Sequence, residues 1–300
     1  MTWQPDIVIY HANCADGFGA AWAAWMRWGS DVAYVPCGYG QTPPDVAGKH
    51  VLIGDFSFKR ETLDALAQSA ASIVILDHHK TAQTDLDAFQ RFADKPERFT
   101  LPVVASMVED LRRGDYPAIL ACFDMERSGA RMVWEFCHPG VEVPRLIELI
   151  EDRDLWRFQF DETKPFGLWL RSEPFNFEAW ELLSQELGDG RDGARIMAEA
   201  RAMQRFFDQK VSELVGMAKF MTIGGVSVPV VNCPPAFASV VADALLGAHP
   251  DAQFAACYHD GRCGRAFSLR SEDARTDVSG VAKRYGGGGH RNAAGFGVPA

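Results

Sequence analysis

The residues of this chain best suited to chemistry are Asp77, His78 and His79, which directly follow an apolar stretch at 73–76. An acid and two imidazoles at the end of a buried strand are costly to place there without a partner. Carboxylate and imidazole ligands together suit Mn²⁺, Fe²⁺, Co²⁺ or Zn²⁺. The triplet therefore predicts a catalytic metal centre, and the alternative is a polar loop with hydrogen-bonded imidazoles.

Two further groups of this kind follow predicted strands. His11 and Asp16 come after a strand at 6–10, and Gly17 lets the backbone turn sharply into a helix. We interpret both side chains as metal ligands, the alternative being that Asp16 only caps the helix. Asp55 ends another strand, where its carboxylate either bridges two cations or caps the next helix.

A pair of acids, Asp152 and Asp154, follows a predicted helix at 143–150. Alone, two acids at this spacing often mark a solvated loop. Parallel strands bring their carboxyl ends to one edge of a sheet, so we expect all these acids to converge there. A cluster of carboxylates repels itself unless cations occupy it.

A glycine-rich segment near the C-terminus has the composition of an anion-binding loop. Consecutive glycines weaken helices and strands, but they let backbone N–H groups approach an anion closely. The segment and the side chains that follow it are Gly286, Gly287, Gly288, Gly289, His290 and Arg291. The alternative is a flexible linker, which the apolar residues at 293–296 disfavour. Arg270 matches phosphate oxygens in its planar geometry, or else forms a surface salt bridge.

The elements that must position these residues alternate between strand and helix. We predict strands at 6–10, 51–55, 72–77 and 117–123, and helices at 17–28, 59–70, 129–136 and 143–150. In this order they imply an α/β protein with a parallel sheet covered on both faces.

A second α/β unit follows two helices at 176–187 and 193–215. Its predicted strands lie at 226–231, 254–258 and 265–269, with helices near Phe237 and Asp277. We therefore expect a metal-binding domain at 1–190, a connecting helix at 191–215 and a smaller α/β domain at 216–300.

Composition narrows the class of substrate. The chain has 300 residues and a net charge of −10, without a Lys/Arg run. A surface that grips long nucleic acid is usually basic, so the charge favours a small anionic substrate held in a pocket. We interpret the 7 scattered cysteines as reduced thiols. With no apolar run of roughly 18 residues and no signal-peptide pattern, we expect a cytoplasmic protein.

Together these motifs resemble those of the DHH phosphoesterase superfamily, in the branch with the DHH-associated C-terminal domain. The matching segments follow the family's order over nearly the whole chain: 11–17, Asp55, 77–79, Asp152 and 286–295. The resemblance implies a DHH-type domain that holds one or two Mn²⁺-type ions. It also implies a second domain that holds the substrate, with the active site in the interdomain cleft.

Carried over by position, the resemblance implies a role for each matching residue. Asp55 would bridge the metals, with Asp16, His78 and Asp152 completing one site and His11 belonging to the other. His79 would lie beside the scissile phosphate. The residues that would hold the substrate are Arg270, Gly287, Gly288, Gly289, His290 and Arg291.

The chain departs from the family pattern at Cys14. Members usually carry a further Asp there, two residues before the position of Asp16. A thiolate ligand favours Zn²⁺ over Mn²⁺. We therefore expect the site that includes His11 to be weak, altered or filled only with substrate present.

The expected function is metal-dependent hydrolysis of phosphoester bonds in small nucleotides or short oligonucleotides, through a metal-activated water. The expected cofactor is Mn²⁺, with Mg²⁺, Co²⁺ or Zn²⁺ as alternatives. A single-strand exonuclease for longer DNA or RNA and a non-catalytic nucleotide-binding protein stay open as other functions. We expect no membrane partner and leave a homodimer open.

Overall fold

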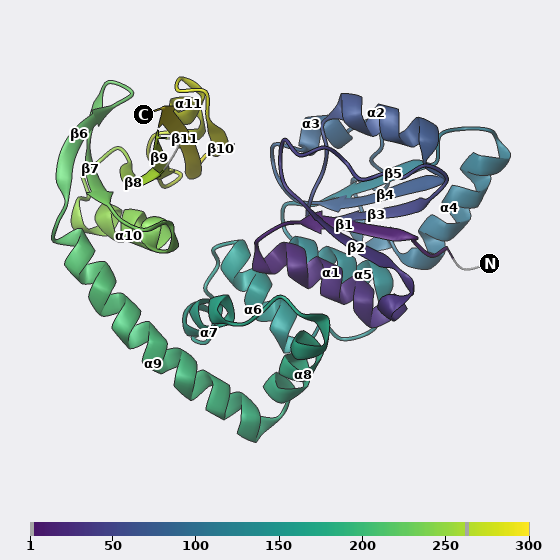
Figure 1. Ribbon diagram of the computed structural model, residues 1–300, viewed down its shortest axis with the longest axis horizontal. Helices are drawn as coiled ribbons and strands as arrows, with labels where there is room; N and C mark the ends of the chain where they lie inside the picture. Colours follow the sequence, from purple (N-terminus) through teal and green to yellow (C-terminus); the bar gives the residue numbers. More distant parts are fainter. Residues whose placement is uncertain (1–2, 262–263, 300) are drawn as a thin grey trace. The chain divides into compact units, whose positions relative to one another are not determined.

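The computed structural model describes residues 3–261 and 264–299, and the chain divides into two compact units, Met1–Gln204 and Arg205–Ala300 (Figure 1). The boundary between them falls inside one long helix, α9 (Gly190–Val215). Among the described residues, no helix combines the length and the apolarity that crossing a membrane requires.

The first unit is built around a five-stranded parallel sheet in the order β2-β1-β3-β4-β5. Its strands are β1 (Ile7–His11), β2 (Ala33–Cys37), β3 (His50–Gly54), β4 (Ser72–Asp77) and β5 (Ile119–Phe123). Its helices are α1 (Ala15–Trp28), α2 (Arg60–Ser69), α3 (Gln83–Leu86), α4 (Leu101–Arg113), α5 (Gly129–Cys137), α6 (Arg145–Asp154), α7 (Thr163–Trp169) and α8 (Phe177–Gly188).

Side chains of the central strands alternate between two cores. In β4, Val74 and Leu76 pack in the core that contains α1 and α5, whereas Ile73 and Ile75 pack in the core that contains α2. Figure 1 shows α1 and α5 on one face of the sheet and α2 and α3 on the other. Because both faces are covered, the strand is apolar at successive positions rather than at alternate ones. The predicted parallel sheet with two covered faces is confirmed.

The strand order places a switch point at the centre of the sheet. The chain passes from β1 outward to β2 and then returns to the other side of β1 to form β3. In sheets of this order, ligands bind beyond the carboxyl ends of the two strands where the order reverses. Side chains that end β1 and follow β3 are therefore well placed for chemistry.

The second unit contains a mixed six-stranded sheet in the order β10-β11-β9-β8-β7-β6. Its strands are β6 (Lys219–Ile223), β7 (Val226–Asn232), β8 (Ala255–Gly261), β9 (Gly264–Arg270), β10 (Gly288–His290) and β11 (Ala293–Pro299), and its helices are α10 (Pro235–Ala248) and α11 (Val278–Lys283). β7 and β8 are parallel, and the other described pairs are antiparallel. The expected fold class, an α/β chain with a smaller α/β unit at its C-terminal end, is confirmed.

Candidate metal centre

The carboxyl edge of the parallel sheet gathers most of the predicted ligands. His11 is the last residue of β1, Asp55 directly follows β3, and Asp77 ends β4. His78 and His79 continue from Asp77 into the loop. Residues that lie far apart in the sequence thus meet at the switch point of the sheet.

Asp55 is the centre of this cluster and is 1% exposed. Its Oδ1 lies 3.1 Å from His78 Nε2 and 3.8 Å from His79 Nδ1. Its Oδ2 lies 3.7 Å from His11 Nδ1 and 3.5 Å from Cys14 Sγ. The backbone of Asp55 has a φ of 54°, a left-handed conformation that Asp tolerates better than most residues. The two carboxylate oxygens face different sets of ligand atoms, as a bridging carboxylate requires.

Three overlapping groups of side chains each offer ligand atoms within 4.8 Å of one another: His11, Cys14 and Asp55; Asp55, His78 and His79; and Asp16, His78 and Asp154. His78 belongs to two of them, because its Nε2 lies 3.6 Å from Asp16 Oδ2 and 3.5 Å from Asp154 Oδ2. The cluster therefore has two ends, which share Asp55 and His78 as their link.

Asp77 organises the loop that carries the histidines. Its Oδ1 accepts hydrogen bonds from the backbone N–H groups of His78 and His79, at 2.8 and 3.1 Å, and lies 2.8 Å from His79 Nδ1. Its Oδ2 is buried and has no hydrogen-bond partner among the described residues. A buried carboxylate oxygen without a partner is costly, and a nearby cation would offset that cost.

Asp16 is held by the N-terminus of a neighbouring helix. Its two oxygens accept hydrogen bonds from the backbone N–H groups of Gly129 and Ala130 in α5, at 2.6 and 3.0 Å. Gly17 lies within α1, where an added Cβ would be 2.1 Å from the carbonyl oxygen of His11. The glycine is therefore required by this close approach, and the sharp turn that the sequence predicts at Gly17 is absent.

Asp154, rather than Asp152, lies beside the other candidate ligands. The Asp152 carboxylate accepts hydrogen bonds from the N–H groups of Gln159 and Phe160, at 2.9 and 3.3 Å, and from the Thr163 hydroxyl. Asp152 thus fixes the loop after α6, whereas the side chain of Asp154 is 36% exposed and faces His78.

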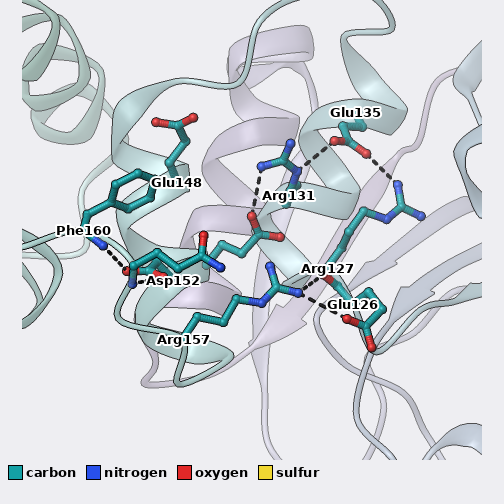
Figure 2. Close-up of a pocket in the computed structure, with 10 residues that line it drawn as sticks. Glu126, Arg127, Arg131, Glu135, Glu148, Asp152, Arg157 and Phe160 are labelled. Atoms are coloured by element: carbon teal, nitrogen blue, oxygen red, sulfur yellow. Dashed lines mark hydrogen bonds and ion pairs between the residues drawn. The ribbon is translucent and has the colours of Figure 1, made fainter.

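A pocket of about 360 Å³ lies on the Asp152 side of α6 (Figure 2). Its residues are Glu126, Arg127, Arg131, Glu135, Glu148, Glu151, Asp152, Arg157, Gln159 and Phe160. Each of its three arginines is ion-paired with acids of the first unit. The pocket is therefore a network of internal ion pairs, separate from the groups that offer metal ligands.

The electrostatics of the cluster favour bound cations. Burial raises the pKa of Asp16 well above its ordinary value, and the carboxylates of Asp55 and Asp154 raise it further. Burial would also raise the pKa of Asp55, but His11 and His78 outweigh it and hold this pKa below its usual range. Burial opposes the protonation of His78, yet the surrounding carboxylates raise its pKa to about 10. The buried acids of the cluster therefore depend on nearby positive charge.

The donor set fits divalent metal ions. Carboxylate oxygens and imidazole nitrogens from several elements converge, and the buried acids repel one another unless positive charge lies between them. Oxygen and imidazole ligands suit Mn²⁺, whereas the Cys14 sulfur is a softer ligand. The cluster is therefore suited to metal binding, with a different donor set at each end.

The residues predicted to bind substrate lie in the second unit. His290, Ala293 and Arg270 occupy one row across β10, β11 and β9, because Ala293 pairs with both of the others. Arg270 donates to Ser239 Oγ at 2.6 Å and to the backbone carbonyl of Leu269 at 3.0 Å. The register thus brings His290 and Arg270 to the same face of the sheet.

The remaining predicted substrate residues form a hairpin rather than an open loop. Gly288, Gly289 and His290 make up β10, which pairs with β11. The Arg291 side chain donates to the backbone carbonyls of Asp273 and Arg275, at 2.7 and 3.2 Å. Arg291 therefore holds the neighbouring loop, while the backbone of the glycines is part of the sheet.

Sequence reasoning missed Tyr39, which lies beside the candidate ligands His11 and His79. Its ring centroid is 5.4 Å from that of His11 and 6.1 Å from that of His79, and the residue is 55% exposed. It follows an edge strand that the sequence analysis did not predict. Only its aromatic type could have indicated a role.

Comparisons with known proteins were made on the whole chain. No family model matches it. It is 28% identical over 313 residues to the uncharacterized protein R106 of Acanthamoeba polyphaga mimivirus, in an alignment that covers 98% of this chain and 67% of that protein.

Solved structures resemble the chain over 98% of its length. They include the DHH domain of a member of the S1p family of ribosomal proteins (TM-score 0.57, 13% identity, 82% of that chain). An exopolyphosphatase-related protein from Bacteroides fragilis (0.54, 14%, 88%) and a pGpG-specific phosphodiesterase from Vibrio cholerae (0.50, 12%, 93%) are also similar. At these identities the likeness concerns the fold. It agrees with the fold that the motifs imply: this chain has the fold of a DHH domain.

Proposed function

We propose that this chain is a metal-dependent phosphoester hydrolase that acts on small nucleotides or short oligonucleotides. The observation that carries the proposal is the convergence of Asp16, Asp55, His78 and Asp154 at the switch point of a parallel sheet. The structural neighbours named as a phosphodiesterase and an exopolyphosphatase-related protein support the same reaction class.

The side chains that would hold divalent cations are His11, Asp16, Asp55, His78 and Asp154. A bound cation would lower the pKa of a coordinated water and neutralise charge on the substrate phosphate. Mn²⁺ suits the oxygen and nitrogen donors at the His78 end of the cluster.

We assign to His79 the stabilisation of negative charge on the reacting phosphate. Burial opposes its protonation, but the hydrogen bond to Asp77 and the nearby Asp55 charge raise its pKa. The hydrogen bond to Asp77 also fixes the orientation of the ring. A fixed donor of this kind stabilises developing charge without having to reorganise. In this assignment Asp77 is a positioning residue.

For the substrate side we propose the row that contains Arg270 and His290, together with the backbone of Gly287, Gly288 and Gly289. Arginine matches phosphate oxygens, and glycine lets the main chain approach them. The exposed ring of Tyr39 offers a surface for stacking on a base. The net charge of −10 favours a short substrate over a long strand.

The test is hydrolysis of pGpG, a 5′-phosphorylated dinucleotide, with and without Mn²⁺. Long single-stranded RNA, single-stranded DNA and inorganic polyphosphate are assayed in parallel. We expect Mn²⁺-dependent release of mononucleotide from pGpG, with little attack on the long strands. Asp55→Asn and His78→Ala should each lower turnover by at least about 100-fold, because each removes a group from the metal centre.

The matched control is Asp251→Asn, a change of the same chemistry at an exposed position of the second unit. It should keep wild-type turnover. If folded Asp55→Asn and His78→Ala proteins turn over like wild type, the assignment of the centre is wrong. Preferential attack on long strands would instead identify an exonuclease, and binding of pGpG without turnover would identify a nucleotide-binding protein.

A further inference from the structure

Cys14 is the one sulfur among the ligand atoms of the three groups in the described residues. Its Sγ lies 3.4 Å from His11 Nδ1 and 3.5 Å from Asp55 Oδ2. Among the described cysteines, Cys14 is partly buried, whereas Cys37 and the others are buried in apolar cores. Its place in the cluster is therefore unlike that of the other cysteines.

The residue also begins a helix. Cys14 is the N-cap of α1, and its Sγ accepts a hydrogen bond from the Gly17 N–H at 3.2 Å. Ser, Thr, Asp or Asn is the usual N-cap, and cysteine is a weak acceptor in that position. Capping alone therefore does not explain a thiol here. What does explain it is the position of Sγ, which lies within 4.8 Å of the ligand atoms of His11 and Asp55.

The two ends of the cluster differ in chemistry. At one end His11, Cys14 and Asp55 offer one nitrogen, one sulfur and one oxygen. Zn²⁺ sites in enzymes use three protein ligands in this way, with an open position. At the other end Asp16, His78 and Asp154 offer oxygen and nitrogen alone, which suits harder ions.

We propose that Cys14 ligates, as a thiolate, a zinc-type ion at the His11–Cys14–Asp55 group, so that the two ends of the centre select different metals. This rests on the metal centre of the proposed function. On binding, the S–H bond breaks, a sulfur–metal bond forms and the proton leaves to solvent. The Asp16–His78–Asp154 end would then take Mn²⁺ or Mg²⁺.

Co²⁺ is the probe, because thiolate ligation to Co²⁺ produces a charge-transfer absorption in the near ultraviolet that oxygen and nitrogen ligands do not. Metal-free protein is titrated with CoCl₂ without oxygen, and calorimetry gives the number of ions bound. We expect this band in wild type and its loss in Cys14→Ser, with binding at the His78 end retained. Both proteins carry Cys263→Ser, so that this cysteine cannot contribute to the absorption band.

Cys14→Asp is the second variant, and it converts the sulfur ligand to oxygen. We expect it to lower Zn²⁺ affinity by at least about tenfold and to raise the number of Mn²⁺ ions bound. In wild type, bound Zn²⁺ should slow alkylation of Cys14, located by peptide mass mapping, by at least tenfold. Circular dichroism checks that each variant is folded.

The outcomes separate this proposal from the one it rests on. Co²⁺ binding without the band, or a band that persists in Cys14→Ser, overturns thiolate ligation by Cys14 and leaves the metal centre intact. If calorimetry detects no Co²⁺, Zn²⁺ or Mn²⁺ binding at all, both proposals fail. Unchanged Zn²⁺ affinity in Cys14→Asp also overturns the assignment of a zinc-type ion to this end.

Discussion

Asp152 and Asp154 are two residues apart in α6, but their carboxylates have different surroundings. A helix turns by about 200° over two residues, so side chains at this spacing point to nearly opposite sides. Asp152 is 4% exposed and fixes the following loop through Gln159, Phe160 and Thr163. Asp154 faces His78. Similar residues at one helix end thus serve stability in one case and the candidate site in the other.

We predict that Asp152→Asn lowers the free energy of unfolding by about 2 kcal/mol, because hydrogen bonds to a buried charged group are lost. Asp154→Asn should change it by less than about 0.5 kcal/mol but weaken Mn²⁺ binding at least tenfold. Urea unfolding of the metal-free proteins and Mn²⁺ calorimetry measure the two effects. Equal loss of metal affinity in both variants would contradict this division of roles.

The stabilisation by Asp152 should also depend on pH. Burial would raise the pKa of this carboxyl, but hydrogen bonds from Thr163, Gln159 and Phe160 hold it below its usual range. A group whose pKa is lowered by folding stabilises the protein above its unfolded pKa of about 4. That contribution is lost as the pH falls through the folded pKa. The gap between wild type and Asp152→Asn in unfolding free energy should therefore shrink below about pH 4.

The kind of site could be predicted from the sequence more completely than the set of residues that form it. His11, Asp16, Asp55, His78 and His79 are brought together at one edge of a sheet, as expected of residues that follow parallel strands. The choice between Asp152 and Asp154 depends on the direction of a helix end, which the spacing of two acids does not encode.

At the level of helices and strands, the start of α5 is fitted against the loop that carries Asp55. Gly129 is the first residue of this helix, and an added Cβ would lie 2.3 Å from Asp55 Cβ and 2.7 Å from Asp55 Cα. The neighbouring Gly129 and Ala130 N–H groups also hold Asp16. The position of α5 therefore determines where two candidate ligands, Asp16 and Asp55, lie.

Gly129→Ala should displace Asp55 and cost about 1–3 kcal/mol of stability, as overpacking does. Mn²⁺ affinity should fall together with stability. The matched control is Gly247→Ala in α10, where an added Cβ meets nothing within 4 Å. That change should stabilise the protein by up to about 1 kcal/mol, since alanine favours helix more than glycine does. Thermal unfolding measures the stability of the two variants, and calorimetry measures their Mn²⁺ affinity. Wild-type metal affinity in Gly129→Ala would contradict the predicted displacement of Asp55.

Strands could be predicted from the sequence where most of their residues are apolar and buried. The strand expected at 72–77 is β4 (Ser72–Asp77), because six buried residues leave a clear signal. The edge strand β2 was not predicted, since it is mostly exposed or half-buried and contains Pro36, which edge strands tolerate. In the second unit β10 was not predicted because glycine has a low strand propensity, and pairing with β11 determines its structure.

At the scale of the whole molecule, the two units have separate cores, and among the described residues the groups of candidate metal ligands lie in the first unit. The candidate centre confines several acids in a protein whose net charge is already −10. Cations that bind only the folded state must stabilise it by mass action. That stabilisation should be confined to the unit that contains the ligands.

We therefore predict that Mn²⁺ at 100 times its dissociation constant stabilises the first unit by about 2.7 kcal/mol. This corresponds to a rise of about 5–10 °C in its unfolding temperature. Differential scanning calorimetry of the full chain, with Mn²⁺ or with EDTA, measures the shift for each transition. The transition of residues 205–300 should stay in place, and Asp55→Asn should abolish the shift in the first unit. An equal shift of both transitions would show that the units unfold together, and no shift in either would remove the thermodynamic basis for a metal centre at the edge of the parallel sheet.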